Sequence, residues 1–180
     1  YVAKGYNQTL LGVPVNGMNL FLKSVLGLDY LCNTVRVQGG AYGGMSVITD
    51  KGDVAGLSYR DPNIVETLER YDGQVEYLEN FNLSQAEFEK NLIGTFSTID
   101  RPLSAAQKGA VAFTRYFTHL TQEKVQQFRD EILAATPEKV RAYAPTMKAI
   151  MDQNAFVVIG NDTKIENHKE LFKNIRNLTK

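Results

Sequence analysis

The sequence has 180 residues, in which 20 basic and 20 acidic side chains cancel and no block of like charge occurs. This balance argues against nucleic acid or an anionic membrane as a partner, and no apolar run approaches the roughly 20 residues that span a bilayer. The single cysteine, Cys32, excludes an internal disulfide and indicates a reducing compartment. Residues 1–6 do not form a signal peptide. We therefore expect one domain, residues 1–180, in a bacterial cytoplasm or an organelle matrix rather than outside the cell.

The first seven residues alternate between the two faces of a predicted strand, with Val2, Lys4 and Tyr6 on one side. Gly12-Val13-Pro14 then makes a turn.

Two helices are predicted between residues 16 and 38, with Gly27 interrupting them. Asn16 can cap the first, and Asp29 suits the positive end of the dipole of the second. The second helix carries four apolar residues at near-helical spacing: Leu28, Leu31, Val35 and Val37. Cys32 is expected to be a small core residue on the apolar face of this helix. The helix runs into Arg36 and ends at Gly39-Gly40, because glycine tolerates the positive φ that a helix end usually needs.

Beyond Tyr42 the pattern becomes extended at residues 46–49, followed by a turn at residues 50–53. A second strand, residues 54–59, completes a hairpin and places Ala55, Leu57 and Tyr59 on one face. The sequence therefore predicts that the second helix is followed by a glycine-rich corner and then by a strand.

The corner motif, Arg36-x-x-Gly39-Gly40-Ala41-Tyr42-Gly43, resembles the second-half motif of the insulinase/pitrilysin family of zinc peptidases. The downstream Tyr59-Arg60-Asp61-Pro62-Asn63 is most similar to the presequence-protease branch. This resemblance covers most of the chain and implies the C-terminal domain of a longer polypeptide. In that family a His-x-x-Glu-His motif in the first half binds zinc, and the second half lends an Arg and a Tyr to the same active site. The implied partners are the N-terminal half and a peptide substrate, and the implied cofactor of the full-length enzyme is zinc.

Arg36 and Tyr42 match those two positions, and their chemistry suits peptide hydrolysis. Negative charge develops on the carbonyl oxygen, where a protonated tyrosine can donate a hydrogen bond; an arginine fork suits substrate carbonyls or a carboxylate. Gly39, Gly40 and Gly43 would let a substrate backbone approach closely. The alternative is that Arg36 complements a helix dipole and Tyr42 is an ordinary strand residue; the complete motif at a helix–strand junction favours the catalytic interpretation.

From Asp61 onward the pattern is helical for nearly a hundred residues. Asp61-Pro62 is expected to be an N-cap followed by a proline in the first turn. Two capping boxes, Ser84-x-x-Glu87 and Ser104-x-x-Gln107, start further helices. Two more begin at Thr121 and at Thr136-Pro137. Pro145 should kink or split the last of these.

Two burial patterns are predicted in this half of the chain. The helix after Ser104 should bury Ala106, Ala110, Phe113 and Phe117, and the aromatic residues Phe113, Tyr116 and Phe117 are expected to be core rather than a ligand site. Residues 155–160 form a continuous apolar run, expected to be a buried strand. A final helix capped by Asp162 or Thr163 should then carry four apolar residues: Ile165, Leu171, Phe172 and Ile175.

Strands, a block of helices and a returning strand predict an α+β domain, with helices layered on one face of an antiparallel sheet. The family resemblance implies the same processing-peptidase-like architecture.

The two histidines, His119 and His168, belong to no zinc motif, so the chain by itself should bind no zinc and be inactive. Three functions remain open: the C-terminal part of a zinc endopeptidase that degrades unstructured peptides, a non-catalytic structural domain of the same fold, and a peptide-binding module. The presence of both Arg36 and Tyr42 favours the first.

Overall fold

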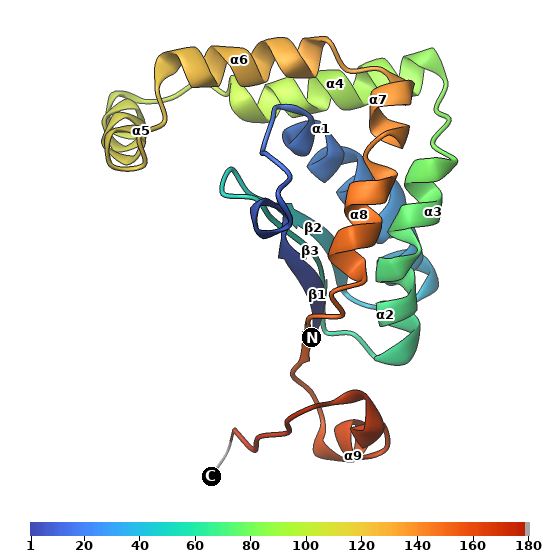
Figure 1. The fold of residues 1–180 in the computed structure, drawn as a ribbon. Helices are drawn as coiled ribbons and strands as arrows, with labels where there is room; N and C mark the ends of the chain where they lie inside the picture. Colours follow the sequence, from blue (N-terminus) through green and yellow to red (C-terminus); the bar gives the residue numbers. More distant parts are fainter. Residues whose placement is uncertain (179–180) are drawn as a thin grey trace.

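The computed structural model describes residues 1–178; residues 179 and 180 of the expected domain lie outside the described part. Four strands form one antiparallel sheet in the order β2-β3-β1-β4, and the helices that pack on it cover one face (Figure 1). The strands are β1 (Val2–Asn7), β2 (Gly43–Ile48), β3 (Asp53–Tyr59) and β4 (Phe156–Val158). The predicted α+β class is confirmed.

The helices follow the strands in a block and extend beyond the sheet. Their bounds are α1 (Met18–Val25), the π-helix η2 (Leu26–Gln38), α2 (Val65–Asp72), α3 (Gln74–Glu79), α4 (Gln85–Ile99), α5 (Ala105–Phe117), α6 (Gln122–Leu133), α7 (Pro137–Arg141), α8 (Ala144–Met151) and α9 (Asp162–Glu166), with short 3-10 turns η1 (Gln8–Leu11) and η3 (Lys169–Leu171). α1 and η2 lie against β2, while α2 and α8 pack on β1. α4 and α6 form an arm across α1, and α5 lies at the end of that arm (Figure 1). In the described part of the chain, no helix combines the length and the apolarity that crossing a membrane requires.

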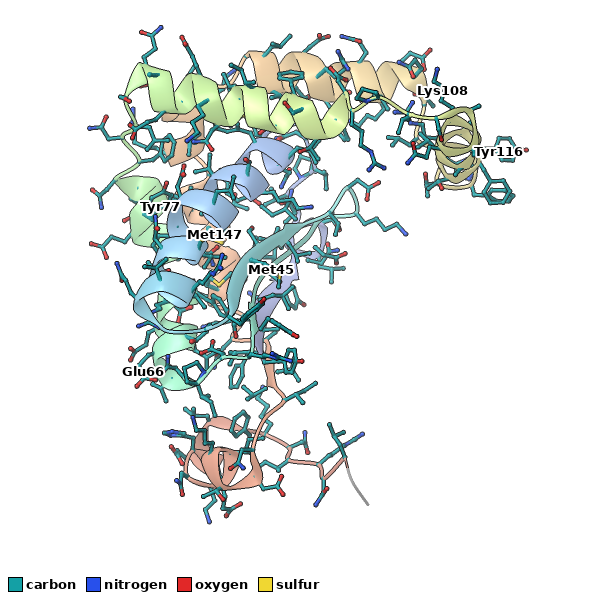
Figure 2. The ribbon with its side chains drawn as sticks, turned by 180° about the vertical axis from the view of Figure 1, so that it is seen from behind. Met45, Glu66, Tyr77, Lys108, Tyr116 and Met147 are labelled. Carbon is teal, nitrogen blue, oxygen red and sulfur yellow. The ribbon has the colours of Figure 1, made fainter. Side chains whose placement is uncertain are left out.

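The sheet has two different faces. Strand register places Gly44, Ser58, Val2 and Val158 in one row, which faces the helices. The next row, Met45, Leu57, Ala3 and Val157, lies on the open face, where Met45 is 48% and Val157 58% exposed. Figure 2 shows Met45 on the sheet.

Tyr71 is the largest fully buried side chain and fixes α2 on the sheet. Its ring lies so close to Gly56 that a Cβ there would be 2.5 Å from a ring carbon, and its hydroxyl donates to the Val2 carbonyl at 3.0 Å. Burial raises the pKa of the Tyr71 phenol. Lys4 lies on the same face and donates to Asp72 at 2.6 Å.

Local signals predicted the helix starts well. Both capping boxes are present, after Ser84 and after Ser104. Thr121 and Thr136 each accept a backbone hydrogen bond at the first turn of their helices. The expected break near Pro145 is the separation of α7 from α8.

The prediction that Gly27 interrupts the first helix is wrong. α1 continues directly into the π-helix η2, where Gly27 faces Ser46 of β2, and a Cβ on Gly27 would make an ordinary 3.7 Å contact there. Because a π-helix has wider turns, the buried residues are Leu26, Leu31 and Val35, whereas Leu28 and Val37 are 64% and 70% exposed. Cys32 is a partly buried free thiol.

The helix start predicted at Asp61-Pro62 is also wrong, since α2 begins at Val65. Asp61 instead stabilises the loop between β3 and α2. Its carboxylate accepts hydrogen bonds from the Asn63 backbone N–H at 2.9 Å and from the Thr67 hydroxyl at 2.8 Å.

The aromatic face predicted to be buried on α5 is exposed, and no residue of α5 is buried. Phe113, Tyr116 and Phe117 are 66%, 77% and 63% exposed, and their rings contact one another. Figure 2 shows Tyr116 on the outer side of α5. The helical period predicted which residues share a face, but not what that face packs against.

The C-terminal segment differs from prediction in two ways. Within the run 155–160, residues 156–158 form β4, an edge strand whose residues are partly or fully exposed rather than buried, since β4 has no neighbouring strand on its outer side in residues 1–178. The following helix, α9, is capped by Asn161 rather than Asp162 or Thr163 and ends at Glu166. Leu171 lies in the 3-10 turn η3, and Ile175 is 49% exposed.

Candidate functional site

The chain turns sharply between η2 and β2. The Gly40 N–H donates to the Arg36 carbonyl at 3.0 Å, and the Ala41 N–H to the Val35 carbonyl at 3.2 Å. Gly40 has φ +77°, a conformation that a residue with a Cβ rarely adopts. We call residues 36–44 the corner. The predicted end of the helix at these glycines is confirmed.

The glycines of the corner differ in what a Cβ atom would contact at each position. A Cβ on Gly39 would lie 2.2 Å from Arg70 Nη1, and one on Gly44 would lie 2.5 Å from the Leu31 carbonyl oxygen. Both therefore admit neighbours from this chain. At Gly43 the nearest atom would be Tyr59 Cβ at 3.8 Å, which leaves more room. That Gly39, Gly40 and Gly43 admit a substrate backbone stays a prediction.

A second loop, residues 59–63, braces the corner. The Tyr42 N–H donates to the carbonyls of Tyr59 at 3.0 Å and Arg60 at 3.3 Å. The Asn63 side-chain amide donates to the Gly39 carbonyl at 2.6 Å. These bonds, with the Asp61 contacts that lead into α2, hold both loops in one arrangement.

Arg36 and Tyr42 lie at the two ends of the corner, Arg36 in the last turn of η2 and Tyr42 directly before β2. Both side chains are exposed, Tyr42 by 66%. Among residues 1–178 neither the Arg36 guanidinium nor the Tyr42 hydroxyl has a hydrogen-bond partner, so both are available to a molecule outside this chain. The Tyr42 ring packs edge-on against Tyr59, with centroids 5.5 Å apart.

Arg60 is a member of the site to which the sequence assigned no role. Its guanidinium carbon lies 5.9 Å from the Tyr42 ring centroid and 5.4 Å from that of Tyr59. Tyr59 in turn packs against Tyr1, with centroids 5.3 Å apart. Arg60 was visible within the Tyr59–Asn63 motif, but its stacking depends on a backbone conformation, φ +47°, that no sequence pattern indicated.

A further arginine lies behind the corner. Arg70 packs against Gly39, and its Nη1 is buried without a hydrogen-bond partner in the described residues. Tyr30 holds the same region by donating its hydroxyl to the Arg70 carbonyl at 2.9 Å. Burial, and next the negative charge of Glu76, raise the pKa of the Tyr30 phenol. With the Arg36 side chain exposed on the corner and the Arg70 guanidinium packed against Gly39, the local positive charge favours a ligand with negative or partly negative oxygen atoms.

The corner offers donors but no metal ligands. Across residues 1–178, no group of three or more His, Cys, Asp or Glu side chains is arranged to hold a metal ion. His168 lies near Glu170, 4.0 Å from Nδ1 to the carboxylate, in the C-terminal segment.

Comparison with known proteins gives consistent findings. A family model described as the PreP C-terminal domain matches residues 1–163. The chain is 43% identical over 180 residues to Protein HypA of Clostridium perfringens, covering all of this chain and 18% of that protein. It is 30% identical over 167 residues to presequence protease 1, chloroplastic/mitochondrial, of Arabidopsis thaliana, covering 92% of this chain and 16% of that protein.

A structural match supports the fold. The crystal structure of pitrilysin superposes with a TM-score of 0.58 at 13% sequence identity, over 84% of this chain and 17% of that one. The chain therefore spans less than a fifth of the length of these relatives.

Proposed function

The chain belongs to the PreP C-terminal domain family of insulinase-type metallopeptidases, and on that premise we propose that it supplies Arg36 and Tyr42 to the active site of a zinc endopeptidase. The remaining part of that active site, including the zinc motif, would lie in the N-terminal half of the same polypeptide. The substrates would be unstructured peptides.

The observation that carries this proposal is the corner itself. Two hydrogen-bond donors of the expected types are exposed and unpaired within residues 1–178, on a turn that a second loop braces at Tyr42 and Gly39. Donors held in place before the reaction stabilise developing charge without the cost of reorganising. An exposed but braced turn therefore suits a catalytic role better than a flexible one.

The two side chains would act on the peptide carbonyl that is cleaved. As negative charge develops on its oxygen, the Tyr42 hydroxyl donates a hydrogen bond to it. Arg36, which is always charged and carries a planar fork, positions the substrate through a neighbouring carbonyl or a carboxylate.

Zinc does not fit the residues described here, because they offer no ligand cluster. The ligands would have to come from the N-terminal half, and no step proposed for Arg36 or Tyr42 passes through the metal. The full enzyme would work in a bacterial cytoplasm or an organelle matrix, without nucleic acid or a membrane as partner.

The test uses the full-length protein and a flexible peptide substrate. Tyr42→Phe removes one donor and keeps the ring, so turnover should fall by roughly 100- to 1000-fold, the usual loss for an oxyanion donor. Tyr116→Phe is the matched control, since that hydroxyl lies on the exposed face of α5, and it should leave turnover unchanged. Arg36→Lys keeps the charge but loses the fork, and should lower activity mainly through substrate positioning.

Zinc content and melting temperature, measured in parallel, should stay at parental values in all three variants. If Tyr42→Phe and Arg36→Lys both turned over like the parent, the catalytic role would be wrong. The alternative, a non-catalytic structural or peptide-binding domain of this fold, would then stand.

A further inference from the structure

Arg60 combines two unusual features at the edge of the corner. Its backbone has φ +47°, which is uncommon for a residue other than glycine. Its side chain is exposed and yet lies against two tyrosine rings, with the guanidinium carbon 5.4 Å and 5.9 Å from their centroids. A mobile surface arginine would require neither feature.

The backbone conformation has a direct consequence for Tyr42. By turning the chain at the end of β3, it brings the carbonyls of both Tyr59 and Arg60 toward the same N–H, that of Tyr42. Asp61, the next residue, fixes the turn through its bonds to Asn63 and Thr67. Strained backbone of this kind persists where surrounding contacts determine it, and it concentrates at functional sites.

The side chain acts on the same residue from another direction. The Tyr42 ring has its edge-on contact with Tyr59 on one side and the Arg60 cation within 5.9 Å. A cation within about 6 Å of a ring is attracted by the negative face of the ring. Together these contacts restrict the ring of an otherwise exposed tyrosine, and thereby the position of its hydroxyl.

We propose that Arg60 is a positioning residue, which holds the Tyr42 ring so that its hydroxyl meets the substrate carbonyl oxygen. This inference rests on the proposed function, because it needs Tyr42 to be a donor. It assigns Arg60 an effect that passes through Tyr42, rather than a contact with the substrate.

A double-mutant cycle in the full-length protein tests this. Arg60→Asn removes the cation but keeps a residue that tolerates positive φ. It should lower kcat on the order of tenfold, since small misplacements of a reacting group are costly, and leave KM nearly unchanged. In the Tyr42→Phe background the same change should alter kcat by less than about twofold, because the hydroxyl to be positioned is gone.

Two controls separate positioning from general structure. Arg60→Lys keeps a cation over the ring and should recover most of the activity. Arg101→Asn, on an exposed loop of the arm, should behave like the parent. A fluorotyrosine at position 42 gives a fluorine NMR signal that should shift with Arg60→Asn and not with Arg101→Asn, independently of activity.

The outcomes are distinguishable. If Tyr42→Phe lowers turnover but the two substitutions are additive, or if Arg60→Asn mainly raises KM, Arg60 does not act through Tyr42 and this inference alone fails. If Tyr42→Phe has no effect, the proposed function fails and this inference with it. An unchanged fluorine signal in Arg60→Asn would also overturn the positioning role.

Discussion

At the scale of single residues, the adjacent glycines Gly43 and Gly44 differ in the room that a Cβ atom would have. A Cβ on Gly44 would lie 2.5 Å from the Leu31 carbonyl oxygen and 2.8 Å from Val35 Cβ, in the contact between β2 and η2. A Cβ on Gly43 would point to the open face, 3.8 Å from Tyr59 Cβ. Both positions lie in the same strand, so alanine restricts the unfolded chain equally in both.

The prediction is that Gly44→Ala destabilises this chain by about 1–3 kcal/mol, the usual cost of overpacking. Gly43→Ala should change stability by less than about 0.5 kcal/mol, as at a site without special contacts. Urea denaturation of the two variants and the parent measures the difference. Equal losses in both would mean that strand conformation, rather than the close contact with η2, explains these glycines.

At the scale of elements, α5 is a helix without a packed face. Phe113 and Phe117 are 66% and 63% exposed, whereas Phe81, in the loop just after α3, is 1% exposed and packs between Tyr77 and Phe88. All three are phenylalanines with ring partners, so they form a matched series in which burial is the main difference.

Phe81→Ala should cost about 3–5 kcal/mol, as expected for a buried phenylalanine. Phe113→Ala and Phe117→Ala should each lower the free energy of unfolding by less than about 1 kcal/mol, because folding buries little of the apolar surface of these two rings. Thermal or chemical unfolding of this chain gives the three values. A large loss at Phe113 or Phe117 would show that α5 packs on the rest of the chain.

Which elements the sequence could predict follows from what each depends on. The starts of α4, α5, α6 and α7 are set by caps such as Ser84 and Thr136 within one turn, and those predictions are confirmed. The π-helical winding of η2, the exposed face of α5 and the edge position of β4 depend on partners distant in sequence. Local periodicity cannot contain that information, so these three were missed.

The same division applies to the candidate site. A short motif predicted that Arg36 and Tyr42 share one helix–strand corner, since nearby residues determine that geometry. The brace from residues 59–63 and the stacking of Arg60 on Tyr42 join segments about twenty residues apart, through a positive φ. Only the folded sheet, which pairs β2 with β3, brings them together.

At the scale of the whole molecule, the proposed function assigns to this chain one side of an active site. The corner presents donors and positive charge, and residues 1–178 contain no cluster of metal ligands. The chain corresponds to less than a fifth of its relatives' length. Under the proposed function, another part of the polypeptide would have to bring the metal and the nucleophile to the exposed side chains of Arg36 and Tyr42.

The last prediction follows from the proposal that this chain supplies hydrogen-bond donors while the rest of the protein supplies the metal. After exposure to zinc and dialysis, this chain alone should retain no stoichiometric zinc by elemental analysis, and it should show no chelator-sensitive cleavage of flexible peptides. Adding the rest of the full-length protein as a separate polypeptide should restore cleavage. A Tyr42→Phe chain in the same mixture should restore at least about 100-fold less cleavage than the parent chain. The matched Tyr116→Phe chain should restore as much as the parent, which controls for assembly of the two parts. One tightly bound zinc per chain, or cleavage by this chain alone that a chelator abolishes, would contradict the prediction, because a complete metal site would then have to exist within these 180 residues.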